Sequence, residues 1–137
     1  MFSLFFITSL MRFFIPIILI SCLLSCNKQL KYEDYDEDDF NEVQGLIISA
    51  IPDGDPFNSS SVKNIRYQYN LDQSPPLIGF ENINMFEAQR GYPLIVLVHK
   101  EDMSISFYGR VGILDSLNTR EKSFLMKHFQ EELEKME

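Results

Sequence analysis

Apolar and polar side chains alternate at every position between Asn64 and Leu71. The apolar members are Ile65, Tyr67, Tyr69 and Leu71, and the polar members are Asn64, Arg66, Gln68 and Asn70. Successive side chains of a β-strand point to opposite faces of its sheet, so this pattern predicts a strand that is buried on one face only. Such a strand needs neighbours to pair with and a cover for its apolar face. The chain must therefore build a sheet around it.

Four other segments predict the remaining strands, because each is apolar or alternating and is bounded by turn residues. They span residues 43–51, 77–83, 94–98 and 103–109. The unbroken apolar run at 94–98 predicts the most buried strand. In the last strand we expect three side chains to face inward, namely Met103, Ile105 and Phe107. Residues 84–91 predict a single helical turn that ends at Gly91.

The period of the pattern changes near the C-terminal end. Asn118 and Glu121 have the spacing of a helix capping box. Beyond them apolar residues recur every three or four positions, which predicts an amphipathic helix; they are Leu125, Phe129, Leu133 and Met136. We expect the helix to belong to the core, with a partner-binding face as the alternative, and to cover the sheet with Phe124, Leu125, Phe129 and Leu133.

The predicted fold over residues 42–137 is thus mainly β (α+β). We expect a small antiparallel five-stranded curled sheet or barrel with one C-terminal helix packed on it.

The first 25 residues are almost entirely apolar, and Arg12 carries their only charge. A membrane span would place Arg12 near the bilayer centre, at a cost of about 2.5–3.5 kcal/mol, and Pro16 would kink it. Translation from Met11 would instead give a short signal peptide with Arg12 as its basic region. Whether Met1 or Met11 initiates stays open, and both starts predict a signal peptide that ends at residue 25.

Both cysteines of the chain, Cys22 and Cys26, lie in or just after this leader. The ending "LLSC", Leu23 to Cys26, resembles the lipobox of bacterial lipoproteins. That resemblance implies cleavage after the small Ser25, a thioether-linked diacylglyceryl lipid on Cys26 with acyl chains such as palmitate, and anchoring in the outer membrane. A plain signal peptide or single-span anchor is the alternative. No thiol follows Cys26, so the body has no disulfide and must be held together by its core.

Seven acidic residues lie between Glu33 and Glu42. Removing Arg12 with the leader changes the net charge from −8 to −9, and these acids account for −7 of it. Because such a run repels itself and cannot bury apolar surface, we predict that residues 26–41 form a lipidated cysteine followed by an acidic disordered tether. The run also resembles the surface-export signal of Bacteroidetes lipoproteins, with a solvated spacer as the alternative. The acidic balance argues against nucleic acid as a partner.

Residues 42–113 are similar to small β-barrel domains of unknown function in bacterial membrane proteins and lipoproteins. The likeness is carried by Gly45, Tyr67, Tyr69, Gly79, Gly91, Tyr92 and Ser104. The usual Asn-Pro before that serine is replaced here by residues 101–103. The resemblance implies a fold and leaves the activity open.

The sequence offers no catalytic or cofactor motif. His99 and His128 lack metal-ligand spacing, and the adjacent acids Glu101 and Asp102 would point apart on a strand. The acids of "PDGDP", residues 52–56, predict a turn and not a calcium loop. Ser116, in "DSL", matches the short pattern of periplasmic O-glycosylation in Bacteroidetes and is a candidate for that modification.

These observations predict a non-enzymatic envelope lipoprotein whose small β domain binds a protein, peptide or glycan. We expect the protein to be located at the outer membrane, on the periplasmic face or the cell surface, and to contact the membrane through its lipid anchor. The alternative is a periplasmic inhibitor or immunity-type lipoprotein that neutralises a toxin or enzyme.

Overall fold

The computed structural model of the chain describes residues 30–135. The chain divides into two units after Asp34, and the described part of the first contains only a short 3-10 turn, η1 (Tyr32–Asp34). The second unit begins at Tyr35 and carries the sheet and the helix. The account that follows concerns this second unit.

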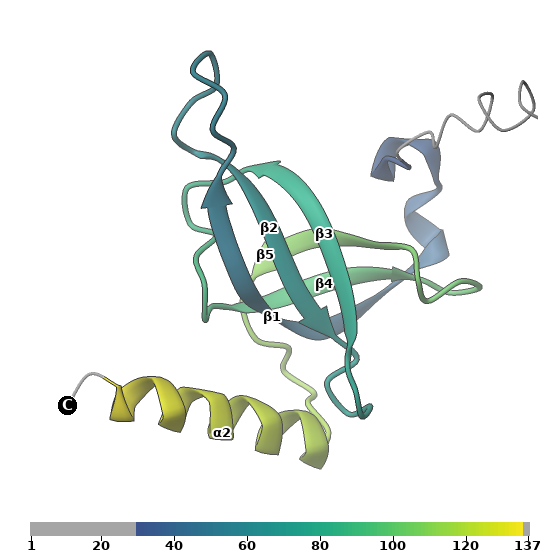
Figure 1. The fold of residues 1–137 in the computed structure, drawn as a ribbon. Helices are drawn as coiled ribbons and strands as arrows, with labels where there is room; N and C mark the ends of the chain where they lie inside the picture. Colours follow the sequence, from purple (N-terminus) through teal and green to yellow (C-terminus); the bar gives the residue numbers. More distant parts are fainter. Residues whose placement is uncertain (1–29, 136–137) are drawn as a thin grey trace, which may run out of the picture. The chain divides into compact units, whose positions relative to one another are not determined.

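Five antiparallel strands form one sheet in the order β3-β2-β1-β4-β5 (Figure 1). They are β1 (Phe40–Pro52), β2 (Val62–Tyr69), β3 (Leu77–Asn84), β4 (Pro93–His99) and β5 (Ser106–Val111). The long first strand pairs with β4 through residues 40–46 and with β2 through residues 45–52. The predicted five-stranded antiparallel sheet is confirmed.

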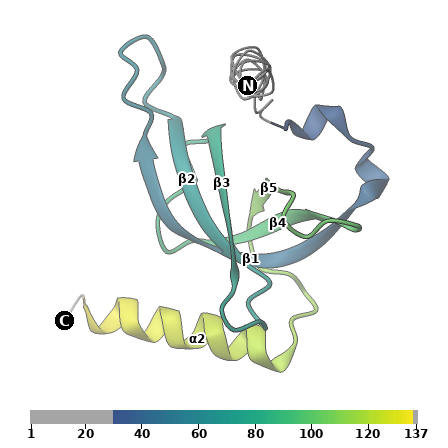
Figure 2. The ribbon, with the colours of Figure 1, turned by 45° about the vertical axis from the view of Figure 1, so that its right-hand side comes forward.

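The sheet is strongly curled, so that β3 approaches β5 (Figure 2). Two register shifts supply bends, because an extra residue in one strand increases its local twist. One lies between Ile47 and Ser49 in β1, and the other lies opposite Ile95 and Val96 of β4, where β5 carries the extra residue Gly109. Gly45 lies at the inner side of the bend, where a Cβ would stand 2.7 Å from Val96 Cγ2. The result is a half-open barrel with the strand order of a five-stranded Greek-key barrel of the OB type.

The main core lies inside this barrel. Its buried members are Ile47, Ile65, Tyr67, Tyr69, Ile83, Ala88, Leu94, Val96 and Val98. The alternation in β2 is confirmed, since its two tyrosines point inward while Asn64 and Arg66 are exposed. The hydroxyl of Tyr67 lies 3.2 Å from Ser106 Oγ on β5, and the hydroxyl of Tyr69 donates to Met103 O at 2.8 Å. Two tyrosines therefore span the interior from β2 to the far wall.

The N-terminal edge of the domain corrects the predicted tether. Residues 37–39 form a 3-10 turn, η2 (Glu37–Asp39), and β1 already begins at Phe40. The ring centroid of Tyr35 lies 5.6 Å from that of Phe40 and 5.4 Å from that of His99. The fold thus starts at Tyr35, because two aromatic rings within the acidic run provide contacts that the count of charges does not reveal. Residues 26–29 lie outside the described residues.

Two smaller predictions also change. Met103 was expected to face inward, but its side chain is 52% exposed because β5 begins only at Ser106. Residues 84–91 form no helix. They connect β3 to β4 by turns, and Gly91 N donates to Ile47 O of β1 at 2.7 Å. Ala88 in this connection is fully buried and closes one end of the barrel core.

The helix α2 (Thr119–Glu134) begins with the predicted capping box. Asn118 Oδ1 accepts from the backbone N–H of Glu121 at 2.9 Å, and Asn118 N donates back to Glu121 Oε2 at 2.9 Å. The helix packs on the outside of the sheet, where it forms a second cluster. That cluster contains Leu46, Leu71 and Leu125, with Leu117, Phe124 and Phe129 at its margin.

The prediction for Leu133 is wrong, since its side chain is 60% exposed. The contacts of α2 with Leu46 and Leu71 extend to Phe129, so the stripe continues past the end of the surface that it covers. Met136, the last member of the predicted stripe, lies outside the described residues. The helix is therefore part of the fold as far as Phe129, and the exposed Leu133 does not contribute.

One prediction follows from this division of the helix. Leu125→Ala should lower the free energy of unfolding by about 3 kcal/mol, since it leaves a cavity beside Leu46 and Leu71. Leu133→Ala makes the same chemical change at an exposed position near the end of α2, and it should lower the free energy of unfolding by less than about 0.5 kcal/mol. Urea unfolding of the two variants measures the difference. Equal losses would mean that the second half of α2 is packed as tightly as the first.

Buried Gln44 ties the connection between β5 and α2 to β1. Its side chain has no exposed surface. The amide nitrogen donates to Leu94 O at 3.1 Å and to Gly112 O at 3.2 Å, and the amide oxygen accepts from Leu114 N at 2.9 Å. The side chain thus replaces backbone partners that the chain loses where β5 ends.

Candidate functional site

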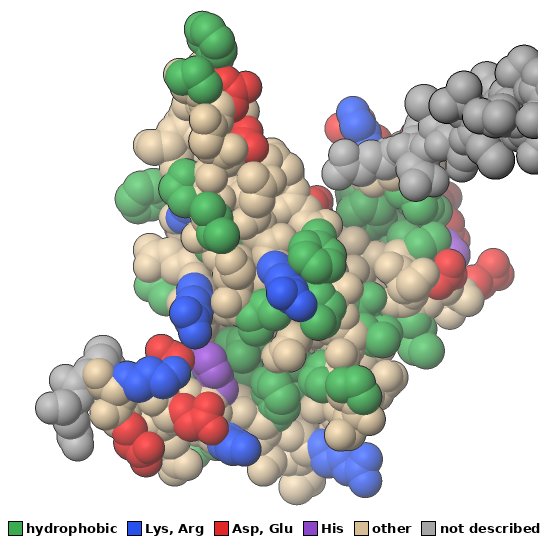
Figure 3. Space-filling view, in the orientation of Figure 1, with side chains coloured by type: hydrophobic (Ala, Val, Ile, Leu, Met, Phe, Trp, Pro, Cys, Tyr) green, Lys and Arg blue, Asp and Glu red, His purple; other side chains and the backbone are tan. Residues whose placement is uncertain are grey.

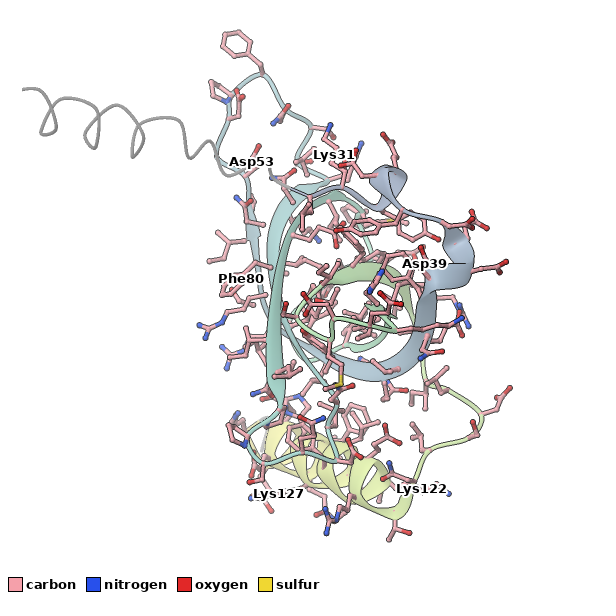
Figure 4. The ribbon with its side chains drawn as sticks, turned by 90° about the vertical axis from the view of Figure 1, so that its right-hand side faces the viewer. Lys31, Asp39, Asp53, Phe80, Lys122 and Lys127 are labelled. Atoms are coloured by element: carbon pink, nitrogen blue, oxygen red, sulfur yellow. The ribbon has the colours of Figure 1, made fainter. Side chains whose placement is uncertain are left out.

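The most distinctive surface of the domain is the side of β1, β2 and β3 that faces away from the barrel interior. We call it the outer face and define it by the side chains Ile51, Asn64, Arg66, Ile78, Phe80 and Asn82. Phe80 is 69% exposed and Ile51 62%. Figure 4 shows Phe80 on the side of the strands opposite the packed interior. Apolar side chains this exposed contribute little to the core, so this face is a candidate binding surface.

Arg66 and Phe80 form the centre of this face. They are paired across β2 and β3, and the Arg66 guanidinium carbon lies 5.3 Å from the centroid of the Phe80 ring. A cation above an aromatic face is attracted to the negative side of the ring. Each side chain therefore restricts the other, and the pair presents an ordered aromatic group together with a charged donor.

A chain of side-chain amides runs beside this pair from β3 to the loop between β1 and β2. Asn82 Nδ2 donates to Asn64 Oδ1 at 2.9 Å, and Asn64 Nδ2 donates to Asp53 Oδ1 at 3.2 Å. Asn58 Nδ2 donates to the other oxygen of Asp53 at 2.5 Å. We call these four residues the amide ladder. Because each amide has two donors and an acceptor with two lone pairs, the ladder retains capacity for a ligand.

The loop between β1 and β2, residues 53–61, projects from the barrel (Figure 1). Phe57 at its tip is 95% exposed, and its backbone N–H donates to Asp55 Oδ1 at 2.9 Å. Ser61 Oγ donates to Asn84 Oδ1 of β3 at 2.6 Å. The predicted turn at residues 52–56 is confirmed, and its acids serve as internal hydrogen-bond acceptors.

The two cations of β2 lie on opposite sides of the sheet. Arg66 lies on the outer face, whereas Lys63 has the phase of the inward-facing Ile65 and pairs with buried Ile83. Figure 3 shows basic side chains next to hydrophobic ones over β2 and β3. Lys63 Nζ lies 5.5 Å from the Phe86 ring centroid and donates to the carbonyls of Phe86 and Ala88 at 2.8 and 2.7 Å. Among residues 30–135, the ion pairs involve neither Lys63 nor Arg66. Arg66 is thus the cation of the outer face, and the carboxylate of Asp53 in the amide ladder lies on the same side.

Sequence reasoning missed a half-buried carboxylate on β3. Glu81 Oε2 accepts from the backbone N–H of Tyr108 on β5 at 2.5 Å, so it bridges the gap between the two edge strands. Burial raises the pKa of Glu81, and the hydrogen bond from Tyr108 opposes that rise. The sequence contains an indication that Glu81 points inward, because Glu81 lies two residues from the buried Ile83 and therefore on the same side of β3.

This carboxylate predicts a pH effect on stability. Since the folded-state pKa lies above the ordinary 4.5, Glu81 contributes stability below that pH and the contribution is lost as the pH rises through the folded-state pKa. Glu81→Gln keeps an acceptor for Tyr108 without the charge. Its melting temperature should exceed that of the wild type at pH 7.5 and equal it at pH 4.

The control for this effect is Glu42→Gln. Glu42 is exposed, and its hydrogen bond with Arg110 lowers its pKa, so the variant should gain nothing at pH 7.5. An equal gain from Glu81→Gln at both pH values would contradict the assignment, because it would show that charge is not the cause.

The other residues considered from the sequence do not converge on a site. His99 Nδ1 accepts from the backbone N–H groups of Glu101 and Asp102, both at 3.2 Å, and so orders the turn between β4 and β5. His128 lies on α2, and its Nε2 is buried without a hydrogen-bond partner. Ser116 is exposed between β5 and α2. Cys26 lies outside the described residues.

Metal and membrane sites were also sought in the described part of the chain. Residues 30–135 contain no group of three or more His, Cys, Asp or Glu side chains arranged to hold a metal ion. None of the helices described is both long and apolar enough to cross a membrane.

Comparison of the chain with protein-family models, with curated proteins and with solved structures found no match.

Proposed function

We propose that this chain is a lipid-anchored, non-enzymatic binding module of the bacterial envelope, and that it binds its ligand on the outer face. The observation that carries the proposal is the stacked Arg66–Phe80 pair beside the amide ladder. These side chains point away from the core, so their order is not required for packing. An exposed aromatic group that is held in place, with hydrogen-bonding groups next to it, is the usual composition of a recognition surface.

The fold supports the same choice of surface by analogy. Partly open five-stranded barrels of this strand order bind extended ligands across their second and third strands and the adjoining loops. Here β2 and β3 carry the outer face, and the loop at residues 53–61 contributes Asp53 to the ladder. An analogy of fold raises the expectation for a site and does not identify its ligand.

The proposal of a lipid anchor rests on the motif "LLSC", residues 23–26, at the end of the apolar leader. Cys26→Ser should abolish incorporation of a labelled fatty acid and leave the protein unprocessed or soluble. Cys22→Ser is the matched control, and it should be lipidated and retained in the membrane fraction like the wild type. Membrane retention of Cys26→Ser at the processed size would overturn the proposed anchor.

Binding on the outer face can be tested by replacing Phe80 with a photo-crosslinking phenylalanine analogue in the host cell. We expect a discrete adduct that disappears when Arg66→Ala is added. The same analogue at Leu133, which is exposed at the far end of α2, should give none. Equal labelling from both positions would contradict a binding role for this face.

An inhibitor of a toxin or enzyme is the second candidate, and the loop at residues 53–61 favours it. The loop is braced by Asp53 and Asp55 and presents Phe57 in solvent. A preorganised loop with one apolar side chain at its tip can enter an enzyme cleft with little loss of entropy. The crosslinking analogue placed at position 57 distinguishes the two, because an adduct there without one at position 80 would favour the inhibitor.

A further inference from the structure

We infer that the free edge of β3 is a pairing surface for the same strand of a second copy of this chain, so that two sheets join across a two-fold axis. The surface is the row of backbone groups along that edge, and what it recognises is an extended backbone. The inference goes beyond the proposed function, because it requires no ligand. Three features of β3 support it: its unpaired backbone groups, its lack of protection, and the side chains that a two-fold axis places opposite one another.

The backbone of β3 has no strand partner along one side. In the described sheet β3 is an outermost strand with β2 as its neighbour, and Figure 1 shows it at the margin of the sheet. Bonded and non-bonded pairs alternate along an antiparallel ladder. Just beyond this ladder Met85 N donates to Ser61 O at 3.1 Å, which fixes the phase of the alternation. The N–H and C=O groups of Ile78, Phe80 and Asn82 therefore point away from β2.

This edge also lacks the usual protection against pairing. Natural sheets protect exposed edges with short strands, bulges, prolines or charged side chains, above all lysine. The other edge strand, β5, is only six residues long, carries the extra residue Gly109 and bears Arg110. By contrast β3 has eight residues in a regular register with β2, contains no Lys, Arg or Pro, and exposes Ile78 and Phe80. Such an edge is a site where another strand adds.

A two-fold axis at Phe80 gives a self-complementary pairing. Directly opposite residues of an antiparallel pair lie on the same face, and only residues whose backbone groups point outward can form the bonded pairs. Phe80 then lies opposite Phe80 of the second copy, and Ile78 lies opposite Asn82. Each of these pairs exchanges both of its N–H···O bonds. The two aromatic rings meet on the outer face, where a cross-strand aromatic pair is favourable.

The inward-pointing Glu81 selects this register over its neighbours. A charge buried against an apolar neighbour opposes pairing, and natural edges use that effect for protection. The axis at Phe80 places Gly79 of the second copy opposite Glu81, where no side chain meets the carboxylate. An axis one residue earlier would set the carboxylate against Leu77, and an axis one residue later would set two carboxylates together. In the chosen register Glu81 can keep its bond from Tyr108 N, at 2.5 Å.

The pairing joins the outer faces of the two copies into one surface. The two Phe80 rings lie at its centre, and each keeps its own Arg66 at 5.3 Å. The Cα atoms of the two arginines are three strand spacings apart, roughly 14 Å, so their charges do not meet. A paired edge of this length is smaller than most stable interfaces, so association should depend on concentration. Confinement of both copies to one membrane by the proposed anchor would favour it.

The register predicts which positions a disulfide can join in the full-length chain. After mild oxidation of membranes from cells that express it, Phe80→Cys should give a covalent dimer, because opposite Cα atoms of a bonded pair lie roughly 5.5 Å apart. Ile78→Cys and Asn82→Cys should each stay at the background of the unaltered chain, since like positions are offset by roughly 13 Å along the strands. The same two variants should form a dimer when they are expressed together.

The matched control for random collision is Ile51→Cys. Ile51 is 62% exposed on the outer face, but it lies on β1 and not at the edge. It should give no more dimer than the unaltered chain. A yield equal to that of Phe80→Cys would overturn the inference, and so would a dimer from Ile78→Cys alone, because the two-fold register would then be wrong.

A charge exchange at the axis tests the same contact without a covalent bond. Phe80→Lys and Phe80→Glu each place like charges directly opposite one another, and each should weaken association at least about tenfold in sedimentation of the lipidated chain in detergent. A mixture of the two should associate again, since opposite charges then meet at the axis. Restored association requires both variants to be folded, so it excludes misfolding as the cause of the loss. Failure of the mixture to associate would overturn the inference.

The remaining outcomes separate the inference from the proposed function. With the photo-crosslinking analogue at position 80, an adduct with a second copy should persist in Arg66→Ala, whereas the adduct with a ligand should be lost. A ligand adduct from a chain that stays monomeric at every concentration overturns the inference and leaves the binding face standing. An adduct with a second copy alone supports the inference, and the proposed ligand then falls. An adduct with a different protein that survives in Arg66→Ala shows another occupant at the edge and overturns the inference.

Discussion

Gln44→Leu should lower the free energy of unfolding of the domain by about 4 kcal/mol. Leucine fills nearly the same volume, so the cost comes from polar groups that lose their partners. Leu114 N and Gly112 O both bond to the Gln44 amide, and they lie where the chain leaves β5. Leaving a buried donor or acceptor unsatisfied costs about 1–3 kcal/mol for each group.

The same substitution should release the segment between β5 and α2. Amide hydrogens of residues 112–118 should exchange faster in Gln44→Leu, while those of β2 and β3 should change only with the global stability. Gln68→Leu, on the neighbouring strand opposite Leu46, is the matched control and should change stability by less than about 0.5 kcal/mol. Similar losses in the two variants would show that the Gln44 hydrogen bonds contribute little.

The second large effect is expected at Gly79. Its place opposite Tyr67 leaves room for the tyrosine ring, since a Cβ at residue 79 would stand 2.4 Å from Tyr67 Cε2. Tyr67 has no exposed surface and its hydroxyl lies near Ser106, so the ring cannot simply move away. Gly79→Ala should therefore cost about 3 kcal/mol through overpacking.

A double-mutant cycle identifies the cause. Tyr67→Leu removes the ring and is itself destabilising, but in its background Gly79→Ala should cost under about 1 kcal/mol. Chemical denaturation of the four proteins measures the coupling. Additive losses would mean that the glycine is needed for the backbone and not for the ring.

The sheet could be predicted because its strands alternate. In β2 the phase of Ile65, Tyr67 and Tyr69 alone fixed which face is buried, and the capping box at Asn118 fixed the start of α2. These signals are local, since a strand or a helix end is determined by residues within one or two turns of chain.

What could not be predicted depends on contacts between distant segments. Gln44 is a polar residue in an apolar strand, and its burial comes from the segment at residues 112–114, to which its side chain is hydrogen-bonded. Leu133 continues a perfect helical stripe, but the surface that the helix covers ends before it. Tyr35 lies in an acidic run, and its ring contacts are made with His99 of β4 and Phe107 of β5, which are distant in the sequence.

The outer face was hidden for a similar reason. Ile78 and Phe80 occupy the solvent-facing phase of β3, and the sequence alone marks them only as two apolar residues in a short strand. Phe80 can be assigned to a pair with Arg66 only when the strand register, which places the two residues opposite each other, is known. The pairing register of a strand is a tertiary property, so no count of residue types reveals it.

The position of β1 between β2 and β4 has a mechanical consequence. A pull on the chain before Tyr35 enters the domain at Phe40, the first residue of β1, and a bound ligand on the outer face would load β2 and β3. The load then runs along β1, whose two ladders must slide past their partners together before the strand can separate. Breaking many hydrogen bonds at once in shear needs more force than opening them one at a time from an edge. Tension applied to the chain before Tyr35 and resisted on the outer face would thus pass through the central strand of the sheet.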